Sequence, residues 1–261
     1  MAEKPNFVLV PDSDTGAGNP RHPIPTVLSR LRDAAVSAVS ALPHRPATLT
    51  VPRPATPAAA SGRPRLVFGF DATASREPAW ATARQVTDAL VRALPGELDV
   101  ALAVHGGSRL HTFTEFTADP NTLRDRAATI SCAAGHTQLL PILSRSLASP
   151  GVRVVVYTGD VYEESLARGR KLADELGRKG IKLIVLHDTA DWAARRDAEL
   201  FLDLARRTGG CVLPFDASAS GRLRDLLAAI AVFAVGGAEL LQNKRGELPG
   251  AVLLLQHLDP H

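Results

Sequence analysis

The chain has 261 residues, of which 45% are hydrophobic, so it is long enough to bury one substantial core. Its 30 basic and 27 acidic residues are interspersed and leave a formal net charge of +3, and aromatic residues make up only 5%. This composition shows neither the basic stripe nor the aromatic platform of nucleic-acid-binding proteins, and we expect no nucleic-acid partner. The two cysteines, Cys132 and Cys211, are too few for a disulfide framework or a zinc site, which fits a reducing compartment.

The first 64 residues differ in composition from the rest of the chain. Residues 12–25 and 43–64 are rich in glycine, proline or alanine and carry few large apolar side chains, which predicts linkers and a partly disordered N-terminal segment. Between them, apolar residues recur at helical spacing, which predicts a short helix at about 26–42. The N-terminus lacks the features of a signal peptide, and no uninterrupted apolar run reaches membrane-spanning length. We therefore expect a cytoplasmic protein with no membrane partner.

From Arg65 onward, strand-like and helix-like segments alternate, which predicts an α/β fold with helices crossing over a largely parallel sheet. Two β-rich runs, 98–105 and 110–116, are separated by a glycine-containing turn, which predicts a hairpin and hence one antiparallel edge strand. We assign residues 65–236 to the domain and residues 237–261 to a C-terminal helical extension. The remaining predicted strands cover 65–71, 152–158, 181–187 and 211–215, and the predicted helices cover 78–94, 119–130, 139–147, 165–178, 195–208, 221–235 and 248–258.

The first predicted strand ends on three short oxygen-bearing side chains at alternate positions, Asp71, Thr73 and Ser75. In a loop that leaves the carboxyl end of a strand, this spacing can turn one carboxylate and two hydroxyls toward a single point. Such a donor set suits a hard divalent cation such as Mg²⁺. The alternative interpretation is a polar strand-to-helix turn in which Ser75 caps the following helix.

Two later loops carry further candidate residues. Thr137 lies in the sequence GHTQL before a predicted helix, and Asp160 follows the most apolar strand in the sequence VVVYTGDVYEE. In an open α/β sheet, ligands bind where loops leave the carboxyl ends of the strands, near the point at which strand order reverses. The loops that carry Asp71, Thr137 and Asp160 all fit that description.

The DATAS sequence from Asp71, the isolated Thr137 after a glycine, the strand ending in Thr-Gly-Asp and the later LARRTGGCVLPFD together resemble a von Willebrand factor A domain. The resemblance covers residues 65 to about 235. It implies a doubly wound sheet with one antiparallel edge strand and a metal-ion-dependent adhesion site that holds Mg²⁺ or Mn²⁺. The residues that match this metal site are Asp71, Thr73, Ser75 and Thr137, with Asp160 as the fifth.

A site of this kind has few charged ligands, so its bound cation keeps net positive charge and an open position that accepts a carboxylate from a partner. The sequence departs from the family pattern at one point, because the family has Thr-Asp-Gly where this chain has Thr158, Gly159 and Asp160. The carboxylate is shifted by one residue and would reach the metal through a water. The strings DATAS, AGHTQ and GDVYEE resemble a bacterial subgroup of intracellular A-domain proteins.

Several nearby residues have simpler interpretations. Glu163 and Glu164 either accept hydrogen bonds around the metal site or lie in the first turn of a helix, where the helix dipole favours them, and we prefer the second interpretation. His136 is expected to make an ordinary hydrogen bond or to face solvent. Trp80 is expected in the core. Three histidines at strand ends lack metal-ligand spacing and are excluded from the site: His105, His111 and His187.

A haloacid-dehalogenase-like phosphatase is the enzymatic alternative. Asp71 would be its nucleophile and Asp160 would hold Mg²⁺. Position 73 is threonine where most such enzymes have their general acid, and no lysine occurs between Lys4 and Lys171 to neutralise the nucleophile and the phosphate. Arg145 or Arg153 would have to replace that lysine.

The function expected from the sequence is a non-enzymatic protein–protein interaction module that binds an acidic group of a partner through a divalent cation. The resemblance implies partners that present Asp or Glu, such as an AAA-type ATPase or a chaperone-like complex, and an adaptor role in complex assembly. A third possibility is a structural domain of the same fold that binds no metal.

Overall fold

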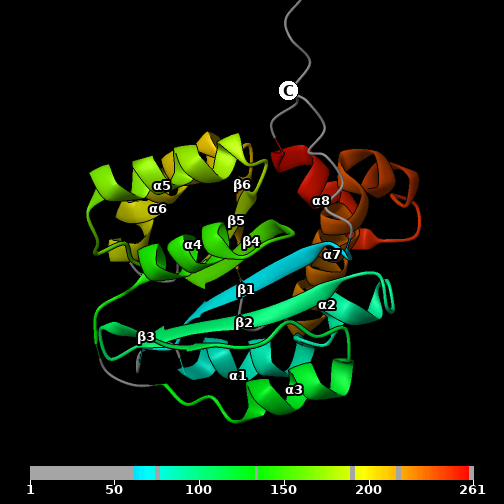
Figure 1. Ribbon diagram of the computed structural model, residues 1–261, viewed down its shortest axis with the longest axis horizontal. Helices are drawn as coiled ribbons and strands as arrows, with labels where there is room; N and C mark the ends of the chain where they lie inside the picture. Colours follow the sequence, from blue (N-terminus) through cyan, green and yellow to red (C-terminus); the bar gives the residue numbers. More distant parts are fainter. Residues whose placement is uncertain (1–61, 74–76, 133–134, 189–191, 216–218, 259–261) are drawn as a thin grey trace, which may run out of the picture. The chain divides into compact units, whose positions relative to one another are not determined.

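A computed structural model describes residues 62–73, 77–132, 135–188, 192–215 and 219–258 (Figure 1). The predicted helix at 26–42, the predicted linker at 12–25, all but residues 62–64 of the predicted linker at 43–64, and Ser75 lie outside the described residues. The described strands form one six-stranded sheet in the order β3-β2-β1-β4-β5-β6. Strand β3 runs antiparallel to β2 at one edge, and all other pairs are parallel. The strands are β1 (Arg65–Asp71), β2 (Asp99–Gly106), β3 (Arg109–Phe113), β4 (Val152–Gly159), β5 (Lys182–His187) and β6 (Cys211–Pro214).

Helices cover both faces of this sheet, which confirms the predicted α/β architecture (Figure 1). On one face lie α1 (Glu77–Val86), α2 (Ala89–Arg92), α3 (Pro120–Ala128), α7 (Ser220–Asn243) and α8 (Pro249–His257), and on the other lie α4 (Leu139–Ala148), α5 (Leu166–Arg178) and α6 (Trp192–Arg207). Each face has its own apolar cluster. Central strands such as β4 are buried on both faces, which explains their continuous apolar sequence.

The helix predicted over 78–94 is two helices in the structure, and the break lies at Thr87 and Asp88. The Thr87 hydroxyl donates to the carbonyl of Ala83 at 2.7 Å, a back-bond that bends helices. The next residue, Asp88, is nearly buried, and its Oδ2 accepts from Arg92 at 2.7 Å and from Arg124 of α3 at 2.8 Å. The chain therefore turns where it is tied to α3. Trp80 is fully buried in the core, as expected.

Helix α7 is longer than the predicted 221–235 and continues to Asn243 through a non-helical residue, Gly237, at φ 68°. It is the one described helix that is long and apolar enough to cross a membrane. However, Leu227 and Ile230 are fully buried in the apolar cluster that also contains Leu254 of α8. We therefore assign α7 to the core of this domain.

The order of the strands places the candidate site. The strand order reverses between β1 and β4, because β1 leads through α1 and α2 to β2 while β4 leads through α5, on the opposite face, to β5. The chain therefore leaves β1 and β4 toward opposite faces at the carboxyl edge, and open α/β sheets bind ligands at such a point.

Candidate metal centre

Asp71 is the last residue of β1 and is fully buried. Its Oδ1 accepts a hydrogen bond from the backbone N–H of Thr73 at 2.9 Å, which closes a tight turn directly after the strand. Thr73 is itself buried, with 7% of its surface exposed. The turn therefore holds the first two predicted ligands close together. The third residue of this set, Ser75, is outside the described residues.

Thr137 lies two residues before α4 and is also buried. Its loop packs on the turn between β2 and β3, because the His136 N–H donates to Ser108 Oγ at 3.0 Å. A side chain at Gly135 would collide with the backbone of Gly107 and Ser108, so only glycine allows this approach. The loop before α4 is therefore fixed at the carboxyl edge of the sheet.

The sheet register relates Asp71 to Thr137. Phe70 pairs with Thr158 of β4, so Asp71 lies beside the end of β4 at the reversal point. Side chains alternate along a strand, and Gly69, two residues before Asp71, faces Ile142 of α4. Asp71 therefore points to the sheet face that α4 covers, at the same edge as the loop that carries Thr137. Asp71, Thr73 and Thr137 thus lie at the same edge of the sheet.

Asp160 lies in the loop after β4, at the same edge. Its Oδ1 accepts from the N–H of Val161 at 2.8 Å, and its carbonyl oxygen lies 2.9 Å from His187 Nε2. A Cβ at position 159 would lie 2.6 Å from Tyr157 Cε1, so a side chain there would press on the buried tyrosine ring. This contact favours glycine directly before Asp160.

A buried histidine underlies the site. His105 pairs in register with Asp71, its Nε2 lies 2.9 Å from the Tyr157 hydroxyl, and its Nδ1 lies 3.7 Å from Asp71 Oδ1. Burial, together with the smaller effect of His111, lowers the pKa of His105 to about 4. His105 is therefore uncharged at neutral pH and brings no positive charge to the buried carboxylate. Spacing in the sequence did not indicate the position of His105 beside Asp71.

The donors present fit a hard divalent cation. They are a carboxylate and hydroxyls, which Mg²⁺ and Mn²⁺ prefer, and the described part of the chain holds no cluster of three or more His, Cys, Asp and Glu residues suited to a metal. Within the same described residues, His105 Nδ1 and Thr158 Oγ1 are buried polar atoms without a hydrogen-bond partner. Each of these two atoms could therefore form one further hydrogen bond at this edge of the sheet.

The two glutamates do not lie in the first turn of α5, so our preferred interpretation was wrong. Ser165 caps α5, and both glutamates precede it. Glu163 Oε2 accepts from the N–H of Thr137 at 2.8 Å, and Glu164 Oε2 accepts from the N–H of Leu140 at 2.8 Å. They accept hydrogen bonds from backbone N–H groups at the start of α4, where the N-cap residue, Gln138, makes no side-chain hydrogen bond.

The surroundings shift the pKa values of these glutamates in opposite directions. Burial by itself raises the pKa of Glu163, but hydrogen bonds from Thr137 and His136 outweigh it and hold the pKa below its usual value. Burial raises the pKa of Glu164, and the hydrogen bond from Leu140 offsets it only in part. As expected, His136 makes an ordinary hydrogen bond, 3.0 Å from Nδ1 to Glu163 Oε1, and is 74% exposed.

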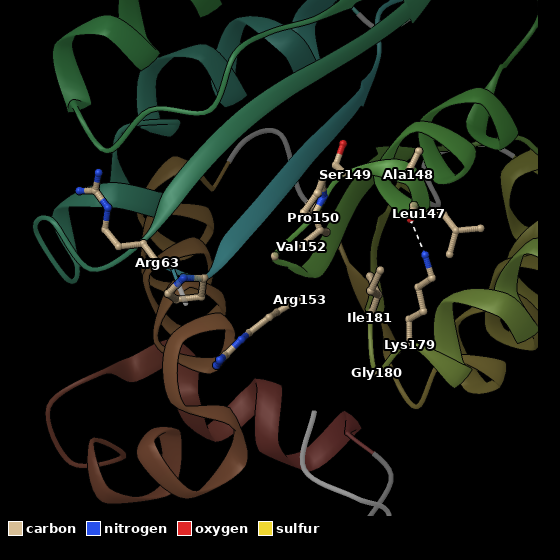
Figure 2. A pocket seen from close by; sticks show the side chains of 13 residues that line it. Arg63, Leu147, Ala148, Ser149, Pro150, Val152, Arg153, Lys179, Gly180 and Ile181 are labelled. Carbon is tan, nitrogen blue, oxygen red and sulfur yellow. Dashed lines mark hydrogen bonds between the residues drawn. The ribbon is translucent and has the colours of Figure 1, made fainter. Parts of the chain in front are cut away.

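A cavity of about 410 Å³ lies at the opposite, amino edge of the sheet (Figure 2). Three cationic side chains line it, but their charged ends point to different sides rather than to one point (Figure 2). Arg153 donates to the carbonyl of Val235 at 2.8 Å, Lys179 to that of Leu147 at 3.0 Å, and Arg63 pairs with Asp99 at 3.3 Å. This cavity therefore lacks the convergent polar groups of the carboxyl edge.

The two arginines that a phosphatase would need are also placed elsewhere. Arg153 is the second residue of β4, at the amino edge, and Arg145 lies in the last turn of α4 over the Phe113 ring, 5.6 Å from its centre. Neither lies beside Asp71.

No protein-family model matches this sequence, and no curated protein matches it. Solved structures do match. They include a von Willebrand factor type A protein from Catenulispora acidiphila (TM-score 0.53, 16% identity, 66% of this chain and 43% of that chain). They also include the pilus adhesin SpaC from Lactobacillus rhamnosus GG (TM-score 0.52, 10% identity, 67% of this chain and 31% of that chain). A third is a mutant of the PilB minor pilin from Streptococcus sanguinis (TM-score 0.50, 12% identity, 67% of this chain and 62% of that chain). The chain spans less than two thirds of each of these. The described domain therefore has a von Willebrand factor A-like fold.

Proposed function

We propose that residues 65–236 form a non-enzymatic interaction module that binds an acidic side chain of a protein partner through a divalent cation, Mg²⁺ or Mn²⁺. Asp71, Thr73, Ser75 and Thr137 are the proposed ligands. Asp160 is the proposed fifth residue and acts through a water.

One observation carries this proposal. A fully buried carboxylate, Asp71, ends β1 at the strand-order reversal, on the same face and edge as the buried hydroxyl of Thr137. A carboxylate and neutral hydroxyls from separate loops bind a cation without cancelling its charge. A bound cation would therefore supply a positive, open coordination position, and the chain's own residues would hold and orient it.

The similar structures support an interaction role in general terms. SpaC is described as a pilus adhesin and PilB as a minor pilin. The further proposal that the module acts as an adaptor in complex assembly, beside an AAA-type ATPase or a chaperone-like complex, rests on the sequence resemblance alone. The phosphatase alternative has less support, because Arg145 and Arg153 are placed away from Asp71.

The direct test of metal binding is calorimetric titration of the full chain with Mn²⁺ and Mg²⁺. We expect saturable binding by the wild type and at least about 100-fold weaker binding by Asp71→Asn, because it removes the one charged ligand of the buried set. Asp119→Asn is the matched control, since Asp119 is exposed and caps α3. If the wild type takes up no cation at millimolar concentration, the metal-free structural alternative holds.

Partner chemistry is tested separately with peptides. A peptide that carries one accessible Glu should bind the Mg²⁺-loaded chain, and the same peptide with Gln should not, because only the carboxylate can fill the open position. EDTA should abolish the binding. Equal binding of both peptides would show that the module does not recognise an acidic group.

A further inference from the structure

The loop that carries Thr137 is held by a residue from a different loop. Glu163 accepts the Thr137 N–H through Oε2 at 2.8 Å, and the Glu163 N–H donates to Thr137 Oγ1 at 3.2 Å. We propose that Glu163 is a positioning residue that aims the Thr137 hydroxyl at the cation, an inference that rests on the proposed function. We call this reciprocal pair of hydrogen bonds the Thr137 clasp.

The clasp fixes both the backbone and the side chain of Thr137. A threonine hydroxyl has one proton and two lone pairs, so accepting from Glu163 leaves a second lone pair available for a cation. Threonine is β-branched and therefore stiff about χ1, which keeps the hydroxyl where the clasp sets it. Thr137 is only 5% exposed, whereas the Glu163 side chain is 37% exposed, so the clasp ties a buried hydroxyl to a carboxylate at the surface.

The clasp also explains why consecutive glutamates follow β4. The first N–H groups of α4 have no local cap, and Glu163 and Glu164 supply two carboxylates near its positive end. Only Glu163 contacts Thr137. Glu164 instead contacts Leu140, three residues further along the chain, and His136 pairs with the exposed side of Glu163.

The proposed cation needs ligands from two loops that are far apart in the sequence. Asp71 and Thr73 are fixed by their own turn, whereas Thr137 depends on a hydrogen bond to Glu163 in the loop after β4. Residues that orient metal ligands without touching the metal typically change its affinity by about 10- to 100-fold. Loss of the clasp should therefore weaken the cation site while the β1 turn remains intact.

The experiment measures Mn²⁺ affinity by calorimetry at pH 8 for the full chain and four variants: Glu163→Ala, Glu164→Ala, Thr137→Val and the double variant Glu163→Ala/Thr137→Val. Alanine is used because a glutamine amide oxygen would still accept the Thr137 N–H. We expect about 10-fold weaker binding for Glu163→Ala and a change within about twofold for Glu164→Ala, which removes the same charge from the same loop without touching Thr137. In the Thr137→Val background, Glu163→Ala should cause no further loss, because the hydroxyl it positions is gone.

Each outcome decides the matter. Mn²⁺ binding by the wild type with an unchanged Glu163→Ala affinity would overturn the clasp and leave the proposed function intact. Equal losses in Glu163→Ala and Glu164→Ala, or a full additional loss in the double variant, would show a charge or stability effect and also overturn it. No binding by the wild type would overturn both proposals. If Glu163→Ala does not fold, Glu163→Asp carries the same test, since it keeps the charge but shortens the reach.

Discussion

The two edges of the same sheet use their polar residues in different ways. At the carboxyl edge, side chains from separate loops bind one another's backbone, as Glu163 binds Thr137, and surround a buried carboxylate. At the amino edge, long cationic side chains reach single carbonyls, as Lys179 reaches Leu147 and Arg153 reaches Val235. The cavity of about 410 Å³ lies at the amino edge, whereas the hydrogen bonds between loops, those of Glu163 and Glu164, lie at the carboxyl edge.

The cavity at the amino edge and the proposed cation site therefore lie at opposite edges of the sheet. Parallel strands with helices on both faces direct the loops of β1 and β4 apart only where the strand order reverses. The amino edge instead gathers the carboxyl ends of helices such as α4, whose unpaired carbonyls attract cations. Substitutions at the two edges should therefore have separable effects, and the following predictions run from the largest expected effect to the smallest.

The largest effect concerns the pH dependence of stability at the carboxyl edge. The pKa of His105 is about 4 in the folded chain and about 6.5 when unfolded, so the unfolded state binds more protons between these values. Stability from this group is therefore present above about pH 6.5 and lost as the pH falls toward 4, a loss of about 3 kcal/mol. Denaturant unfolding in EDTA should show that the wild type loses about this much more than His105→Gln between pH 7 and 4.

The exposed His111 provides the control for that experiment. His111→Gln should leave the pH dependence nearly unchanged, because burial is the main cause of the His105 shift. Parallel pH profiles for the wild type and His105→Gln would contradict the prediction.

A steric effect of intermediate size is expected at Gly159. Its Cα lies so close to the Tyr157 ring that an added Cβ would be 2.8 Å from the tyrosine hydroxyl. Gly159→Ala should lower the free energy of unfolding by about 2 kcal/mol, a typical cost of overpacking. Thermal and urea unfolding measure this change. In a Tyr157→Leu background the cost should fall, and an undiminished cost there would refute the steric explanation.

The smallest effect is expected at the amino edge. Lys179→Met removes the donor to the Leu147 carbonyl near the end of α4 and should cost about 0.5 kcal/mol of stability, as measured by urea unfolding. Mn²⁺ affinity should not change, because the substitution lies at the opposite edge of the sheet. A shift in Mn²⁺ affinity as large as that of Glu163→Ala would remove the distinction between the two edges.

Much of the fold could be predicted from the sequence, because periodicity is a local signal. The apolar run of β4 and the hairpin of β2 and β3 appear where the pattern places them. The helix over 78–94 was predicted as continuous, since its break depends on Asp88 meeting Arg124 of α3, a contact between distant residues. Spacing along one segment does not contain that information.

The candidate site divides in the same way. The chemistry of Asp71, Thr73 and Thr137 could be recognised from their residue types and from the strand ends they follow. The roles of Glu163, Glu164 and His105 could not, because each depends on a partner in another loop or strand. From the sequence we expected the glutamates to lie in the first turn of their own helix and to interact with its dipole. In the structure they precede that helix and accept hydrogen bonds at the start of α4.

The sequence by itself determined the layered α/β architecture, the antiparallel edge strand and the identity of the oxygen donors, because strand and helix periods and the chemistry of each side chain are local properties. Only the tertiary structure decided which face Asp71 takes, why glycine precedes Asp160, and which carboxylate holds Thr137. Those outcomes depend on sheet register and on steric contacts between residues far apart in the chain, and they exist only once the strands have paired.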